Sequence, residues 1–458
     1  MQQYFDQLRA IMPTAVTGSV VRTEGMMTAV AGFPAPVGAL VEIEPQAGEP
    51  IGGEVVGFRD ELTLVCPFRA VSGVRRGNRV RLKRTSRFLR VGAALLGRVI
   101  DAHGRTQDPL PEPALPDRVP YDRPPPPAID RPPIDTPLST GVRAIDGLLT
   151  CGRGQRVGIF AGSGLGKSVL LGMMARYTAA DVSVIALIGE RGREVNEFLE
   201  RDLGPEGLAR SVVVVATSDE PALLRVRAAM AATAVAEYFR DQGKDVLLLM
   251  DSLTRFAMAQ REIGLGTGEP PTTRGYPPSV FGLLPRLAER AGRSGRGSIT
   301  AFYSVLVEGD DTNEPISDSV RAILDGHVVL SRKIASRGHY PAIDVLESIS
   351  RLMPAIVPRD HWQAALSFRE LLAAYREHED LISIGAYRQG ANPKVDLAVT
   401  LLDDLQRFLR QDIQERSSVE RARGELGKLA ARFAMAPRAP AMLPPAGHDA
   451  AAPGSTRG

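Results

Sequence analysis

The sequence is poor in cysteine, and this excludes several classes of protein. Only Cys66 and Cys151 occur in 458 residues, which is too few for a disulfide framework and gives no metal-ligand spacing. The N-terminus has neither the basic start nor the continuous apolar run of a signal peptide. No stretch of about 18 apolar residues occurs, so no segment is predicted to span a membrane. We therefore expect a cytoplasmic protein.

A large excess of charge of one sign is also lacking. Lys and Arg total 56 and Asp and Glu total 53, so the formal charge of +3 does not by itself indicate a polyanionic partner. Residues 75–90, RRGNRVRLKRTSRFLR, are the local exception, with eight basic residues and no acid. Arg79, Arg81 and Lys83 alternate and would share one face of a strand. This face is either simply solvated or a patch for anionic lipid or an acidic partner beneath a membrane.

The apolar runs that are present are short, and their spacing divides the chain. Val-rich runs broken by glycine predict a small antiparallel barrel or sandwich. Strand-length runs that are apolar on both faces alternate with helical stretches and predict an α/β domain with a buried parallel sheet. Helical patterns follow, and a tail rich in Pro, Ala and Gly predicts disorder. The predicted divisions are a short N-terminal segment 1–13, a β-barrel 14–92, an α/β domain 93–360, a helical domain 361–435 and a tail 436–458.

Proline is concentrated in residues 109–137, inside the α/β range. Proline stiffens a chain toward polyproline II, so this connector is expected to be extended. It is either an arm that lies over other structure or a spacer.

The stretch AGSGLGKS, residues 161–168, lies between a predicted strand and a predicted helix. Glycines let successive backbone N–H groups point at one anion, and the helix adds its positive N-terminal end. Lys167 would reach the β- and γ-phosphates of a nucleotide, and the Ser168 hydroxyl would bind Mg²⁺. The predicted nucleotide-binding residues are Gly162, Ser163, Gly164, Leu165, Gly166, Lys167, Ser168 and Val169.

Two acids follow neighbouring predicted strands and would complete a hydrolytic site. Asp251 ends the run DVLLLMD and could hold Mg²⁺ beside Ser168. Glu190 follows SVIALIG and could polarise the attacking water. Glu194 is the competing candidate for that role, and Asp251 could instead be a solvated acid at a strand end.

Long motifs around these residues resemble the flagellar protein-export ATPases, which are relatives of injectisome ATPases and of rotary ATP synthase catalytic subunits. The resemblance runs from about residue 14 to 433 and is carried by CGRGQRVGIFAGSGLGKSVLLGM, IALIGERGREVNEFLERDLGPEGL, DQGKDVLLLMDSLTRFAMAQREIGL, GEPPTTRGYPPSVF and GHYPAIDVLESISRLMP. It implies a RecA-like P-loop NTPase core between an N-terminal β-barrel and a C-terminal helical domain. Six such subunits would form a ring with sites at their interfaces.

The resemblance also implies roles for residues outside the glycine loop. Asp251 matches the Walker B acid and Glu190 the catalytic glutamate. Arg351 matches an arginine finger that reaches the neighbouring subunit's γ-phosphate, although from the sequence alone it could be a surface ion pair. Arg191 and Arg255 match further phosphate-side arginines. Tyr340 matches an aromatic that packs on adenine, or it is an ordinary residue at the end of a strand.

The function that the resemblance implies is an Mg²⁺-dependent ATPase that drives flagellar type III protein export as a homo-hexamer. Expected partners are a stator-like regulator, a coiled-coil stalk protein, an export gate, chaperone–substrate complexes and the inner face of the cytoplasmic membrane. The injectisome ATPase and the rotary synthase catalytic subunit are the alternatives. A non-catalytic ring subunit would carry glutamine in place of Glu190. An RNA hexamer would need clustered aromatics in the barrel. The barrel range has no such cluster, so we expect no nucleic-acid partner.

Overall fold

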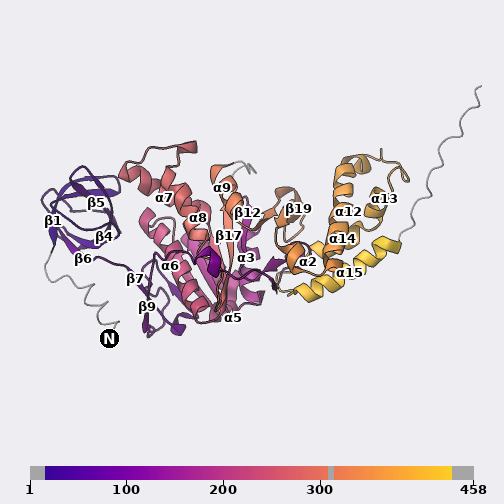
Figure 1. The fold of residues 1–458 in the computed structure, drawn as a ribbon. Coiled ribbons are helices and arrows are strands. Elements are labelled where there is room, and N and C mark those ends of the chain that lie inside the picture. The colour runs from indigo at the N-terminus through magenta and orange to yellow at the C-terminus, as the bar shows by residue number, and fades with distance from the viewer. Residues whose placement is uncertain (1–15, 308–313, 436–458) are drawn as a thin grey trace, which may run out of the picture.

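The computed structural model describes residues 16–307 and 314–435, and these form three parts in a row (Figure 1). A barrel lies at one end, an α/β domain in the middle and a helical domain at the other end. This confirms the predicted architecture. The expectations for segment 1–13 and tail 436–458 lie outside the described residues. Within the described ranges, no helix is both long enough and apolar enough to cross a bilayer.

The N-terminal strands close into a barrel rather than a sandwich. Their order is β1-β2-β5-β4-β3-β6, and β1 also pairs with β6. Val20, Val30, Val41, Val55 and Val65 fill its core. The strands are β1 (Thr17–Glu24), β2 (Met27–Ala31), β3 (Leu40–Glu44), β4 (Ile51–Arg59), β5 (Leu62–Pro67) and β6 (Arg79–Arg84).

The barrel itself ends with β6, earlier than residue 92. Strand β7 (Phe88–Val91) leaves the barrel and pairs with β9 (Asp117–Pro120) of the connector. Residues 88–91 were predicted to lie in the barrel because they continue its pattern of short apolar runs. Their partner strand lies within the proline-rich segment, where no strand pattern is visible.

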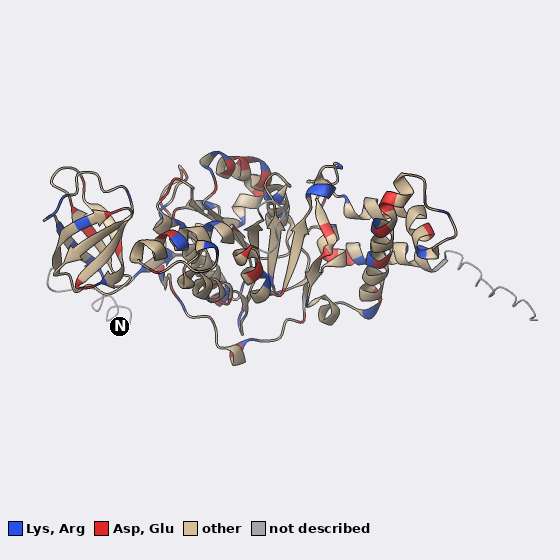
Figure 2. Ribbon diagram, turned by 90° about the horizontal axis from the view of Figure 1, so that it is seen from above, with Lys and Arg blue, Asp and Glu red and all other residues tan. Residues whose placement is uncertain are grey.

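The basic strand β6 contains no acid, but a neighbouring strand supplies acidic partners for two of its bases. Its neighbour β3 places Glu44 3.1 Å from Arg81 and Glu42 2.9 Å from Lys83. Figure 2 shows basic and acidic residues interspersed on the barrel ribbon. Two of the three bases that share this strand face are therefore paired, which favours a solvated face of mixed charge over a continuous basic patch.

The central sheet has the order β19-β18-β12-β17-β15-β13-β14-β8, with β16 beside β17. Neighbours from β18 to β8 along this order are parallel, and β19 is an antiparallel edge strand. The strands are β8 (Arg98–Ile100), β12 (Arg156–Ala161), β13 (Val182–Ile188), β14 (Ser211–Ala216), β15 (Asp245–Asp251), β16 (Gly292–Arg293), β17 (Ser298–Leu306), β18 (Gly326–Leu330) and β19 (Ile343–Ser350).

Helices cover both faces of this sheet, so its strands are buried on both sides. One face packs on α6 (Ala222–Asp241), α7 (Leu253–Thr267), α8 (Pro278–Ala288) and α9 (Pro315–Ile323). The other packs on α2 (Arg143–Leu148), α3 (Lys167–Tyr177) and the C-terminal helices. The shorter elements are β10 (Pro137–Leu138), β11 (Cys151–Gly152), α4 (Gly192–Glu197), the π-helical turn η3 (Phe198–Leu203), α5 (Gly204–Ala209), α10 (Arg332–Ala335), α11 (Met353–Ile356) and the 3-10 turns η1 (Ala93–Leu95), η2 (Ala128–Asp130) and η4 (Thr273–Gly275).

The proline-rich connector is an arm that lies over the α/β domain. Tyr121 is buried, its hydroxyl donates to the carbonyl of Ala102 at 3.0 Å, and Arg290 donates to the carbonyl of Tyr121 at 2.8 Å. Farther along, Arg131 forms an ion pair with Glu289 at 2.5 Å. A spacer would make no such contacts, so the docked alternative holds.

The C-terminal helices attach to the central domain through α2. The Arg143 guanidinium is nearly buried, donates to the carbonyl of Phe408 at 2.8 Å and lies 2.5 Å from Glu415. These helices are α12 (Arg359–Ser383), α13 (Pro393–Thr400), α14 (Leu402–Leu409) and α15 (Val419–Met435).

Candidate active site

The glycine loop lies where the sequence predicted it, between β12 and α3. Gly164 and Gly166 have φ angles of 77° and 83°, a left-handed conformation that glycine adopts without a steric cost. Gly166 is the N-cap residue of α3, and Lys167 is the first residue of that helix. Backbone N–H groups at the start of a helix have no partner within it, so residues 162–168 can bind an anion.

Three charged side chains meet beside this loop. Nζ of Lys167 lies 2.5 Å from Oδ1 of Asp251 and 3.6 Å from Oε1 of Glu190. Glu190 follows β13 and Asp251 ends β15, so both come from the carboxyl edge of the parallel sheet. The structure thus brings together residues that are up to 84 positions apart in the chain.

Burial sets the electrostatics of this group. Burial, together with the charge of Asp251, raises the pKa of Glu190 to about 7. Burial by itself lowers the pKa of the Lys167 ammonium, but the carboxylates of Asp251 and Glu190 outweigh it and raise that pKa. Glu194 is more exposed, and a hydrogen bond with Glu190 and the Arg191 charge lower its pKa. Of the two glutamates, Glu190 is therefore the one poised near neutral pH, where a general base works best.

Arg255 lies against the turn that carries Glu190. A Cβ at Gly189 would lie 3.0 Å from Cβ of Arg255, and the φ of Gly189 is 69°, so both the close contact and the left-handed backbone favour glycine here. The Nε of Arg255 is buried and has no hydrogen-bond partner among the described residues. Arg191, by contrast, has a side chain that is 79% exposed and pairs with Glu194 at 3.1 Å. Arg255 thus packs on the turn directly before Glu190, whereas Arg191 extends into solvent.

Tyr340 lies beside the glycine loop. A Cβ at Gly166 would lie 3.6 Å from Cδ1 of Tyr340, and the Tyr340 side chain is 48% exposed. The carbonyl of Tyr340 accepts a hydrogen bond from the backbone N–H of Gln411 at 3.1 Å. A half-exposed ring beside a phosphate loop can pack on a planar base.

Arg351 lies far from the loop of its own subunit. It follows β19, and its N–H donates to Asp325, whose N–H donates to Arg156 at the start of β12. The glycine loop follows the other end of β12, about 17 Å away for a strand of this length. Arg351 is exposed and forms no ion pair with the residues that the structure describes, so the ion-pair alternative is not seen there.

The oxygen atoms near the loop fit a magnesium ion. Mg²⁺ prefers hard oxygen ligands and usually takes only one or two from protein, with phosphate and water supplying the rest. The Ser168 hydroxyl is exposed at the start of α3, and Asp251 is a carboxylate 3% exposed at the sheet edge. No larger metal-binding cluster of His, Cys, Asp or Glu occurs within residues 16–307 and 314–435.

Two residues that position these groups were not predicted from the sequence. Ser304 on β17 donates to Oδ1 of Asp251 at 2.6 Å. Its only signal was a polar residue near the carboxyl end of the apolar run SITAFYSVLV. Gln411, which contacts Tyr340, also accepts from the N–H of Arg143 at 2.6 Å and donates to the carbonyl of Gly141 at 2.8 Å. No local pattern indicates these long-range contacts.

Two family matches cover this site and the helices beyond it. Residues 141–350 match the nucleotide-binding domain of the ATP synthase alpha/beta family, and residues 357–428 match the T3SS EscN ATPase C-terminal domain. The second match indicates a type III secretion ATPase rather than a rotary synthase subunit.

Individual relatives cover nearly the whole chain. The flagellum-specific ATP synthase of Bacillus subtilis is 52% identical over 416 residues, which are 90% of this chain and 94% of the relative. The type 3 secretion system ATPase of Xanthomonas euvesicatoria is 53% identical over 404 residues, 88% of this chain and 91% of the relative. The structure of the assembled ATPase EscN from enteropathogenic E. coli matches with a TM-score of 0.85 and 47% identity, over 90% of this chain and 99% of that one. The chain therefore belongs to the ATPase family of flagellum-specific ATP synthases and type III secretion ATPases.

Proposed function

We propose that this protein hydrolyses ATP to drive protein export by a flagellar type III apparatus. The observation that carries the catalytic part is the meeting of Lys167, Glu190 and Asp251 at the carboxyl edge of the sheet, beside a glycine loop. This arrangement supplies a phosphate-binding cation, a base and a metal-binding acid in one place.

In the proposed reaction the phosphates of a nucleotide bind to the loop 162–168. Lys167 then leaves its ion pair with Asp251 and binds a phosphate oxygen instead. Glu190 orients the attacking water and accepts its proton as the water attacks the γ-phosphorus. The bond from that phosphorus to the β–γ bridging oxygen breaks in the same displacement, so ADP leaves and inorganic phosphate forms. Ser168 and Asp251 would hold Mg²⁺, which neutralises charge on the β- and γ-phosphate oxygens when bound. Arg255 donates to the developing charge, and the Tyr340 ring packs on the base.

Arg351 would serve the site of a neighbouring subunit. Its exposure, and the length of the sheet between it and its own glycine loop, support a role in trans. A ring of identical subunits, which we take to be a hexamer, would place each Arg351 at the next subunit's γ-phosphate. The relative EscN has been solved both assembled and in complex with its central stalk EscO. We accordingly propose a stalk protein as a partner of this chain.

The stretches LGPEGL, AMAQREIGL and PPTTRGYPPSVF support the flagellar assignment. Coverage does not separate the two kinds of ATPase: the flagellum-specific ATP synthase of Pseudomonas aeruginosa is 49% identical over 94% of this chain, and the type 3 secretion system ATPase of Sinorhizobium fredii is 49% identical over 90%. An injectisome ATPase is the second candidate, since the injectisome relatives are as similar in sequence to this chain as the flagellar relatives are. We place the protein in the cytoplasm, peripheral to the membrane, where it would meet the stator-like regulator, the export gate and chaperone–substrate complexes.

The test of the ring mechanism is ATPase activity per subunit as a function of protein concentration. If sites are completed between subunits, specific activity rises steeply with concentration. High activity that stays constant down to concentrations at which the protein is monomeric would contradict the role of Arg351 in trans. Motility of a flagellar-ATPase deletion strain that expresses this chain, compared with secretion by an injectisome-ATPase deletion strain, separates the two export systems.

A further inference from the structure

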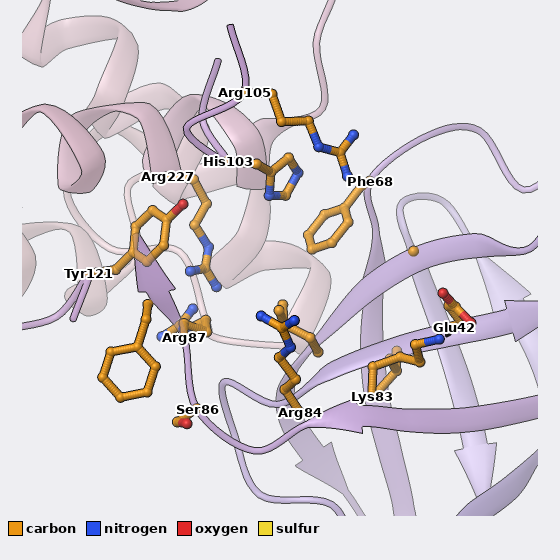
Figure 3. Close-up of a pocket in the computed structure, with 14 residues that line it drawn as sticks. Glu42, Phe68, Lys83, Arg84, Ser86, Arg87, His103, Arg105, Tyr121 and Arg227 are labelled. Carbon is orange, nitrogen blue, oxygen red and sulfur yellow. Dashed lines mark ion pairs between the residues drawn. The ribbon is translucent and has the colours of Figure 1, made fainter. Parts of the chain in front are cut away.

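A second cleft lies outside the active site, where the barrel meets the α/β domain. Its volume is about 370 Å³, which lies within the usual range for small-molecule sites. The end of β6 supplies Arg84, the turn after β8 supplies His103 and Arg105, and α6 supplies Arg227 (Figure 3). Phe68 and Tyr121 add aromatic rings. The cleft therefore combines basic and aromatic side chains from both parts of the chain.

The cleft has more positive than negative charge. Lys83 is neutralised by Glu42 at 2.9 Å. Arg87 and Arg227 share a single carboxylate, that of Glu54. Because Arg227 and Glu54 are only 5% and 4% exposed, water screens this imbalance weakly.

The two remaining arginines have no acidic partner. Neither Arg84 nor Arg105 forms an ion pair with the described residues, and both are exposed. The nearest acid on the same turn, Asp101, accepts hydrogen bonds from the backbone N–H groups of His103 and Arg105 and does not line the cleft. Burial lowers the pKa of His103, so at neutral pH this ring is a neutral hydrogen-bonding group. Arg84 and Arg105 thus line one cleft without an acidic partner among the described residues.

The aromatic rings define two walls of this space. The ring of Phe68 meets that of His103 edge to face, with centroids 4.8 Å apart. The Arg227 guanidinium lies 5.5 Å from the centroid of the Tyr121 ring. In the view of Figure 3, Tyr121 and Phe68 lie on either side of the Arg227 guanidinium. Tyr121 is buried beneath that guanidinium and backs the cleft, whereas the partly exposed ring of Phe68 can pack on a planar ligand.

We propose that this cleft binds a phosphorylated small molecule that carries a planar ring, of about the size of a nucleoside monophosphate. Guanidinium groups bind phosphate oxygens through paired, charge-assisted hydrogen bonds. Arg84 of the barrel and Arg105 of the α/β domain would share the phosphate, and the ring of Phe68 would contact the base. A bound ligand would therefore bridge the two parts. The site is separate from the ATP site and does not depend on the proposed export function.

The test is calorimetry on the full chain with AMP and inorganic phosphate as probes. The Lys167→Ala background weakens binding at the glycine loop. The Arg84→Gln/Arg105→Gln double variant should weaken AMP binding about tenfold or more, because two charge-assisted contacts are lost. Its matched control is Arg79→Gln/Arg90→Gln, which removes the same charge from exposed arginines outside the cleft and should leave AMP binding unchanged. Inorganic phosphate should bind more weakly than AMP.

Three outcomes would overturn the proposal. Equal losses in the double variant and its control would show nonspecific attraction by barrel charge. Phosphate that binds as tightly as AMP would remove the role of the Phe68 ring. AMP binding that survives the double variant but is abolished by Tyr340→Ala would belong to the active site.

Discussion

Nζ of Lys167 lies 2.5 Å from Oδ1 of Asp251, so the cation that would bind phosphate is held by the acid that would bind the metal. Both side chains are largely buried, and removing one partner of such a pair leaves the other charge unpaired at a high cost. Nucleotide binding therefore has to replace one ion pair by two interactions, Lys167 with phosphate and Asp251 with the metal. This exchange couples the binding of phosphate to that of the metal.

Glu190→Gln should separate binding from turnover. The amide cannot accept a proton, so turnover should fall by about 100-fold or more, while ATP binding measured by calorimetry stays near that of the unmodified protein. Glu194→Gln is the matched control, since Glu194 is the more exposed glutamate four residues on, and it should retain activity. If Glu194→Gln lost turnover and Glu190→Gln kept it, the role of general base would belong to Glu194 instead of Glu190.

Activity should depend on pH through Glu190. Burial and the charge of Asp251 raise the pKa of Glu190 to about 7, and only its ionised form can accept a proton. kcat/KM should therefore increase as pH rises toward 7 and level off above it. The pH profile of kcat/KM checks this, and the residual activity of Glu190→Gln should lack the acidic limb. An acidic limb at the ordinary pKa of a glutamate would argue for a solvated base.

Mixing two inactive variants should restore activity if Arg351 acts in trans. Arg351→Ala supplies intact Lys167, and Lys167→Ala supplies intact Arg351, so an interface between them contains one complete site. ATPase activity should reappear when the two proteins are mixed at ring-forming concentrations. Lys167→Ala mixed with Glu190→Gln is the control, because both losses affect the same half of a site and no complete site forms. Absence of recovery in mixed rings whose co-assembly is verified would refute the role in trans.

Tyr340→Ala should weaken ATP binding with little effect on the chemical step. An aromatic contact contributes about 0.5–1.5 kcal/mol beyond its buried area, so KM should rise about threefold to tenfold with kcat nearly unchanged. Tyr340→Phe keeps the ring and should resemble the unmodified protein in steady-state kinetics. A fall in kcat without a change in KM would place this ring outside the base-binding region.

Arg143→Met should destabilise the attachment of the C-terminal helices. Arg143 is 7% exposed and bonds to Phe408 and Glu415, and breaking a buried ion pair costs about 3 kcal/mol or more. Arg423→Met removes the exposed pair with Asp360 at 2.8 Å and should cost less than about 1 kcal/mol. Urea unfolding followed by fluorescence compares the two, and equal midpoints would contradict the anchoring role of Arg143.

The sequence predicted the elements whose signal is local. The glycine loop, the buried strands and the acids that follow them are each contained in a short pattern, so β12, β13 and β15 appear where expected. Pairing between distant segments could not be predicted. Strand β8 has only three residues, and its partner β14 begins more than a hundred residues later. The acids that neutralise Arg81 and Lys83 could not be predicted for the same reason, since they lie on another strand. Neither Ser304 nor Gln411 belongs to a local motif, because their contacts exist only after folding.

The separation of Arg351 and Lys167 at opposite ends of one sheet gives each subunit a direction. If the arginine of one subunit completes the loop of the next, an open row always ends with one loop that lacks an arginine and one arginine that lacks a loop. Only closure of the row removes both defects. Partly built rings would then hydrolyse less ATP per subunit than closed ones, and the last subunit to join would complete two sites at once.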